Sequence, residues 1–111
     1  MRIGILLVSL LIGSVCFAHF KPNPKGFLVT YQKGINWNAS KVYKKQNKMG
    51  DHVFYLRQLY HDGKLLLGAN KESDKLGVYI FKGDNLKEVQ KTINNDPAIK
   101  NKVLQFEIEA L

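Results

Sequence analysis

Residues 64–82 read KLLLGANKESDKLGVYIFK and decide the fold. Two apolar runs flank a polar segment, a pattern that predicts two antiparallel strands joined by a hairpin loop. In residues 65–67 and 78–81 consecutive side chains are apolar, so both faces of each strand are apolar. A sheet with one face in water alternates apolar and polar side chains instead. The second face therefore needs a cover, which a second copy of the chain would supply. Alternatively the second face has no cover, and the strands simply expose a few aromatic side chains to solvent.

A helix and a strand are expected before this hairpin. Asp51 is a typical N-cap, and Gly63 is a typical residue to follow the end of a helix. The apolar residues between them recur at helical spacing. They predict one buried face made of Val53, Leu56, Leu59 and Tyr60. Further upstream, residues 27–32 (FLVTYQ) are typical of a strand.

A second helix and a last strand are expected after the hairpin. Asn85 and Glu88 have the spacing of a capping box. Leu86, Val89 and Ile93 predict the buried stripe of the helix that follows. Asp96-Pro97 ends that helix, and residues 103–108 (VLQFEI) predict a strand. The order β-α-β-β-α-β predicts an α+β, ferredoxin-like fold, in which a four-stranded antiparallel sheet carries both helices on one face.

Residues 1–18 (MRIGILLVSLLIGSVCFA) are typical of a secretory signal peptide. Arg2 is the positive start, residues 3–15 are apolar, and Cys16 and Ala18 put small residues at −3 and −1 of a cut after Ala18. The apolar run is too short for a stable membrane span, so we expect a periplasmic or secreted protein after cleavage near Ala18. An uncleaved anchor and lipid attachment at Cys16 are the alternatives.

The rest of the chain is expected to be a flexible lead-in (residues 19–26) and one domain (residues 27–111). A length of 111 residues excludes a multidomain enzyme and a polytopic membrane protein. The single cysteine, Cys16, lies in the expected leader, so no disulfide framework is expected.

Across residues 27–109 the sequence resembles the YCII-related family. The segments that carry the resemblance are FLVTYQKG, DHVFYLRQLYHDGKLLLGA, GVYIFKGDNLKEVQKTINNDP and VLQFEI. His52, the Gly-Lys-Leu-Leu run that begins at Gly63, Gly68 and the pair Asp96-Pro97 match the pattern of the family. Lys48-Met49, Ala69 and Ala98 depart from it at positions where a pocket would be lined.

The resemblance implies a dimeric α+β barrel with a cleft for a small molecule. It implies His52 and Asp96 as the catalytic pair, with the ring of His52 opening onto the cleft within hydrogen-bonding reach of the Asp96 carboxylate. The implied chemistry is of lyase type, the removal of a proton and a leaving group from a hydroxylated aromatic. A secretory leader is unusual for this family.

The residues themselves leave other interpretations open. His52 lies in the first turn of the expected helix and borders its buried face, where the neutral, basic form of the ring is favoured; a surface histidine beside a cap is the alternative. Asp96 before a proline is often only a turn residue. Tyr31, Tyr55 and Tyr79, with Gly68, are expected in the substrate pocket; the tyrosines could equally belong to the core or to an interface.

Other partners are not expected. The lysine-rich loop of residues 41–48 suits a solvated surface or attraction to an acidic envelope. Arg57 is the one arginine outside the leader, which together with export argues against nucleic acid as a partner. His61, in the last helical turn, is expected to be structural, and no phosphate loop, dinucleotide fingerprint or metal spacing indicates a cofactor.

Two functions therefore follow from the sequence. The first is acid/base chemistry of lyase type on a small molecule, an aromatic one being the first candidate, with His52 as the base and Asp96 orienting it. The second is a non-catalytic module of the same fold that binds a small ligand or a protein in the cell envelope. A catalytic pair requires both side chains at one cleft, whereas a binding module requires only the cleft.

Overall fold

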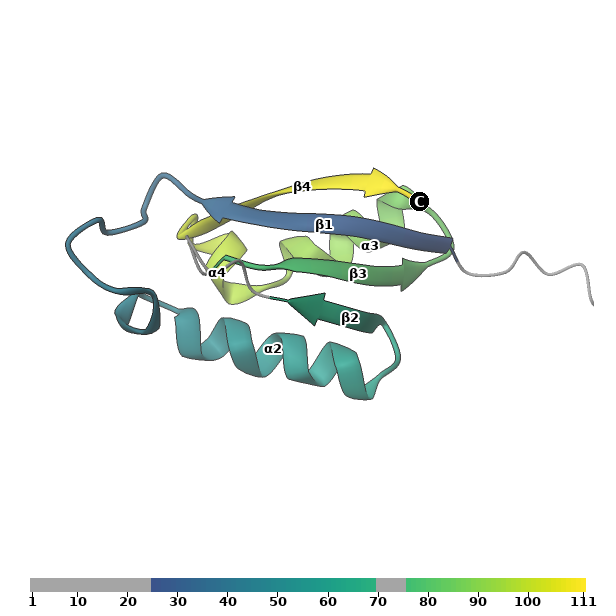
Figure 1. The fold of residues 1–111 in the computed structure, drawn as a ribbon, viewed down its shortest axis with the longest axis horizontal. Helices are drawn as coiled ribbons and strands as arrows, with labels where there is room; N and C mark the ends of the chain where they lie inside the picture. The colour runs from purple at the N-terminus through teal and green to yellow at the C-terminus, as the bar shows by residue number, and fades with distance from the viewer. Residues whose placement is uncertain (1–24, 70–75) are drawn as a thin grey trace, which may run out of the picture.

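Alternating side chains place β1 (Lys25–Lys33) inside a four-stranded antiparallel sheet of order β2-β3-β1-β4 (Figure 1). The computed structural model describes residues 25–69 and 76–111. The expected signal peptide, most of the expected lead-in and the expected hairpin loop at 70–75 lie outside these residues. In chain order the other elements are η3 (Tyr43–Lys45, a 3-10 turn), α2 (Met49–His61), β2 (Leu65–Ala69), β3 (Val78–Gly83), α3 (Leu86–Asn94), α4 (Pro97–Lys100) and β4 (Leu104–Ala110).

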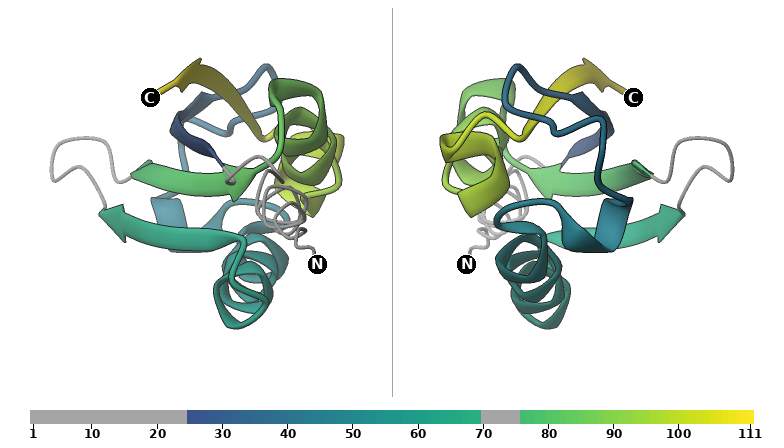
Figure 2. Two further views of the ribbon diagram at one scale, coloured as in Figure 1. Left: turned by 90° about the vertical axis from the view of Figure 1, so that its right-hand side faces the viewer. Right: turned by 90° about the vertical axis from the view of Figure 1, so that its left-hand side faces the viewer.

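The predicted β-α-β-β-α-β order is confirmed, with η3 and α4 as additions. β1 pairs with β3 on one side and with β4 on the other. Its buried side chains, Phe27, Val29 and Tyr31, lie on the face that α2 and α3 cover, and Figure 2 shows both helices on the same side of the sheet. The arrangement is that of a ferredoxin-like fold.

Helix α2 begins earlier than the sequence predicts. Asp51 is not its N-cap, because Lys48 takes that place with a φ of 63° and no side-chain cap. The buried stripe of the helix is Met49, His52, Leu56 and Leu59. Val53 and Tyr60, predicted to be buried, are 40% and 60% exposed. The stripe that meets the sheet is rotated toward His52, because packing against the sheet selects it.

The predicted N-cap of α3 at Asn85 is confirmed, but the reciprocal bond of the predicted capping box comes from Asp84, one residue before the cap. The Asn85 side chain accepts a hydrogen bond from the Glu88 N–H at 2.8 Å, and the Glu88 carboxylate accepts one from the Asp84 N–H at 2.6 Å. Val89 and Ile93 are buried as predicted, whereas Leu86 is 45% exposed. The first residue of the helix lies beyond the edge of the core, so the predicted stripe is one residue too long.

The two faces of β3 differ in their cover. Phe81 pairs with Phe27, so it lies on the helix-covered face, where it is 1% exposed. Ile80 pairs with Leu28 and with Leu67, so these side chains lie on the opposite face. No described helix packs on that face, and the half-buried and exposed apolar side chains there agree with the predicted two-sided strands.

Within residues 25–69 and 76–111, no helix is long and apolar enough to cross a membrane.

Candidate active site

His52 enters the interior of the domain from the first helical turns of α2. It is the fourth residue of the helix, and its N–H donates to the Lys48 carbonyl at 2.9 Å. Its exposed fraction is 0%, so the histidine belongs to the stripe that packs on the sheet. Burial of a polar ring is unfavourable unless its nitrogens find partners, which makes those partners informative.

Asp96 reaches the same place from the other end of the helical layer. The sequence predicts a break at Asp96-Pro97, and the structure places there the start of the short helix α4. Asp96 is the N-cap of this helix, with its Oδ1 accepting from the Ala98 N–H at 2.9 Å and Pro97 in the first turn. Proline suits that position because its nitrogen has no hydrogen to leave unpaired. The cap turns a fully buried carboxylate inward.

The two side chains form a direct pair, as the family resemblance implies. His52 Nδ1 lies 2.5 Å from Asp96 Oδ2, and both side chains are 0% exposed. A carboxylate only accepts hydrogen bonds, so the ring proton is on Nδ1 and donates to Asp96. The lone pair of the neutral ring is then on Nε2. That atom is buried and has no hydrogen-bond partner among the described residues.

Tyr31 is the side chain that lies against the ring of His52. Their ring centroids are 5.1 Å apart at 78°, an edge-to-face contact. Burial, and next the negative charge of Asp96, raise the pKa of Tyr31 well above its usual value. The phenol therefore stays protonated at neutral pH. Its hydroxyl, like Nε2, is buried without a partner among the described residues.

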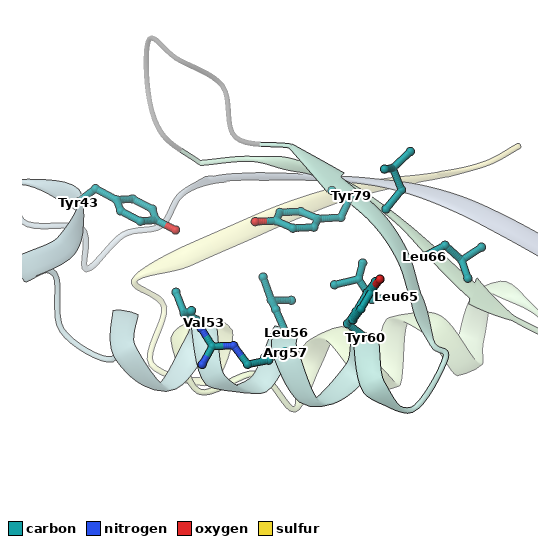
Figure 3. Close-up of a pocket in the computed structure, with 10 residues that line it drawn as sticks. Tyr43, Val53, Leu56, Arg57, Tyr60, Leu65, Leu66 and Tyr79 are labelled. Atoms are coloured by element: carbon teal, nitrogen blue, oxygen red, sulfur yellow. The ribbon is translucent and has the colours of Figure 1, made fainter.

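An apolar cavity of about 550 Å³ lies beside this pair, between α2 and the β2–β3 hairpin (Figure 3). It is lined by Tyr43, Val53, Leu56, Arg57, Tyr60, Leu65, Leu66, Leu67, Gly68 and Tyr79. The size suits a small molecule. The cavity explains why Val53 and Tyr60 are not in the core, since they form its α2 wall.

The four residues expected in a pocket have different places in the structure. Gly68 and Tyr79 line the cavity. Tyr31 is buried behind it, and Tyr55 lies between the helices, where its hydroxyl donates to the Thr92 carbonyl at 2.7 Å. Gly68 has a specific reason to lack a side chain, because an added Cβ would collide with the ring of Tyr79.

Eight of the ten cavity residues were not predicted to line a pocket, among them Tyr43, Arg57 and Tyr60. Val53, Arg57 and Tyr60 recur at i, i+4 and i+7, so a second helical stripe beside the buried one was the available signal. No sequence signal pointed to Tyr43, because its position depends on the conformation of the loop before α2. Buried Gln46 organises that loop, its amide nitrogen donating to the carbonyls of Asn38 and Lys41 at 2.7 and 2.8 Å.

Two side chains in series, Tyr79 and Tyr31, separate the cavity from the histidine. Tyr79 lines the cavity and contacts Tyr31, with ring centroids 5.5 Å apart, and Tyr31 in turn contacts His52. Leu56, one turn after His52 on α2, lines the cavity from below. The ring of His52 is thus within reach of Asp96 as expected, but it does not line the cleft.

The described part of the chain contains no group of three or more histidine, cysteine, aspartate or glutamate side chains placed to hold a metal ion. His61 is exposed at the end of α2, where its ring contacts Tyr60. The pair His52–Asp96 has the geometry of an oriented base.

Comparison with known proteins identifies the family. The model of the family described as "YCII-related domain" matches residues 16–109, which is most of the chain. No curated protein matches the sequence. The chain therefore belongs to the YCII-related domain family.

Proposed function

We propose that this YCII-related protein performs acid/base chemistry of lyase type on a small molecule, with His52 as the base and Asp96 as the group that orients it. The observation that supports this proposal is the arrangement of the ring, in which Nδ1 is held by Asp96 and Nε2 has no described partner. A carboxylate on Nδ1 keeps the lone pair on Nε2 and stabilises the imidazolium that forms when Nε2 takes a proton.

The reaction would proceed in balanced steps. Nε2 of His52 takes a proton from a carbon of the substrate, and the electron pair of the broken C–H bond forms a new double bond. The leaving group departs with the electron pair of its own bond. Asp96 remains ionised throughout, and the proton on Nε2 then passes to the leaving group or to water, which restores the base.

Access to the base is the condition that the geometry places on this mechanism. The substrate enters from the cavity, and Tyr31 and Tyr79 stand between the cavity and His52. Tyr79 packs directly on Gly68, and Tyr31 packs between Tyr79 and His52, so both rings have to shift before a substrate reaches Nε2. We expect the ring of Tyr79 to move when a substrate binds.

A non-catalytic binding module is the second candidate, and the complete burial of His52 favours it. In that case the pair His52–Asp96 joins α2 to the start of α4, and the cavity alone binds the ligand. The two candidates differ only in whether Nε2 reacts with the ligand.

A thermal-shift screen of small organic acids and phenols would test the proposal, since a ligand that binds the native state raises the melting temperature. Each compound that binds is then incubated with the protein, and product is sought by mass spectrometry. Turnover that depends on His52 supports the enzyme. Binding with no turnover of any ligand supports the binding module.

We also propose a homodimer through the sheet face that the helices leave uncovered. Ile80, Leu28 and Leu67 provide its apolar centre, and a typical interface would bury about 800 Å² on each partner. Light scattering of the wild-type protein should give the mass of a dimer at micromolar concentration. Ile80→Lys should give a monomer, because a charge would be buried at the interface. Leu86→Lys, on the exposed start of α3, should remain a dimer. A monomeric wild type would contradict the proposal.

Export is proposed from the leader alone. The signal-peptide pattern at residues 1–18 predicts cleavage after Ala18 and a periplasmic or secreted protein. The intact mass of protein recovered from the envelope fraction or the medium should correspond to a chain that begins at His19. A mass that retains residues 1–18 would contradict it.

A further inference from the structure

The cavity beside the pair has one polar end and one apolar end. Figure 3 shows the hydroxyls of Tyr43 and Tyr79 facing each other across its mouth, with the guanidinium of Arg57 below them on the same side. Tyr60, Leu65 and Leu66 stand at the other end. The lining thus combines donors gathered at one end with an apolar remainder.

Among the described residues that line the cavity, Arg57 is the only one with a charged side chain. None of the described lining residues is an aspartate or glutamate, and Arg57 has no ion pair with a described residue, whereas Lys48 pairs with Asp51. Arg57 is exposed at the edge of a largely apolar lining, and its guanidinium is unpaired with any described acidic residue, so it is available to an anion, and its planar fork fits a carboxylate. The net charge of +8 on the chain adds a long-range attraction for anions.

The two phenols would extend this site. Burial, then Tyr43 and Asp96, raise the pKa of Tyr79 to about 12, so its hydroxyl remains a donor at neutral pH. Burial also raises the pKa of Tyr43. Arg57 and Tyr43 can therefore donate hydrogen bonds at the end of the cavity where the phenol of Tyr79 also lies, and these donors match the acceptor oxygens of a carboxylate.

We infer that this cavity binds an organic anion with a planar apolar body, its carboxylate held by Arg57 and its body lying between α2 and the β2–β3 hairpin. An aromatic carboxylate fits best, because the rings of Tyr60 and Tyr79, together with Leu65 and Leu66 of β2, form the walls. Binding rests on the cavity alone. Only the assignment of this anion as the substrate rests on the proposed function.

Calorimetric titration of the full chain with 2-naphthoate and with its neutral analogue 2-naphthamide tests the inference. Naphthoate should bind about 10-fold or more tightly than the amide, because a charge-assisted hydrogen bond contributes more than a neutral one. Arg57→Gln should weaken naphthoate binding by about 10–100-fold and change amide binding little. Lys87→Gln, which removes the same charge from exposed α3, should change neither. Arg57→Lys should retain part of the affinity, since the charge stays and the fork is lost.

Several results would overturn the inference: naphthoate that does not bind, naphthoate that binds no better than the amide, or equal effects of Arg57→Gln and Lys87→Gln. The proposed function fails separately. Naphthoate binding should be unchanged in His52→Asn, because His52 does not line the cavity. If turnover of a substrate survives in His52→Asn, His52 is not the base, and the anion site is unaffected by that result. Loss of turnover in His52→Asn with full naphthoate affinity in Arg57→Gln would refute the anion site alone.

Discussion

His52→Asn is expected to lower the turnover of a substrate by about 10²–10⁴-fold, the usual contribution of a general base. Asparagine is the sharpest substitution here, because its amide N–H can occupy the place of Nδ1–H and still donate to Asp96. The buried carboxylate keeps its partner, while the nitrogen that takes the proton is gone. The kcat/KM of the variant, measured on protein with an unchanged circular dichroism spectrum, checks this result.

His61→Asn is the matched control, since His61 lies on the same helix but is exposed. It should leave turnover unchanged. Turnover that persists in His52→Asn would show that the pair only joins α2 to α4, and the binding module would then be the better description.

Asp96→Asn should remove the base in a different way. Asp96 Oδ1 accepts from the Ala98 N–H, so an amide there would keep its carbonyl oxygen on Ala98 and turn its NH₂ toward His52 Nδ1. Nδ1 would then have to accept, which moves the ring proton to Nε2 and takes away the basic lone pair. The ¹⁵N chemical shifts of the His52 ring should show this exchange of tautomers, with no substrate needed. An Nε2 that carries the proton in the wild-type neutral ring would contradict the assignment.

Asp96→Ala is expected to destabilise the fold by about 2–6 kcal/mol, because each buried donor left without an acceptor costs about 1–3 kcal/mol. The substitution leaves the Nδ1–H of His52 and the Ala98 N–H without acceptors in the interior. A small domain is stable by only about 5–15 kcal/mol, so a large part of the stability would be lost. Equilibrium unfolding in guanidinium chloride measures the change.

The control for this prediction is Asp62→Ala, at the exposed end of α2. It should shift the free energy of unfolding by less than about 0.5 kcal/mol. The loss of unfolding free energy in Asp96→Asn should lie between those of Asp96→Ala and Asp62→Ala, because asparagine preserves the cap of α4. An Asp96→Ala protein as stable as the control would show that water reaches the site and replaces the lost oxygens.

The candidate site was predictable only in part. The matches to the YCII-related pattern singled out His52 and Asp96, and the structure joins them, although 44 positions separate them in the chain. No local periodicity could have paired them, since helical and strand spacings relate only residues a few positions apart. Arg57 was missed as a site residue because its importance depends on the hairpin opposite it, not on its neighbours in α2.

By itself, the sequence determined what depends on nearby residues. The order of strands and helices, the N-cap at Asn85 and the break at Asp96-Pro97 follow from backbone hydrogen bonds and side-chain periods that span at most a few residues. The two-sided apolar character of β3 was equally legible, because a period of two alone shows that Ile80 and Phe81 point to opposite faces.

Only the tertiary structure decided which face is which. Phe81 is in the core because it pairs with Phe27, and Ile80 is on the open face because it pairs with Leu28. In the same way, the packing of α2 on the sheet buries the side chain of His52 and leaves that of Val53 exposed. Strand register and helix rotation are set by contacts between distant segments, whose free energy depends on the fit of whole surfaces and not on any one residue.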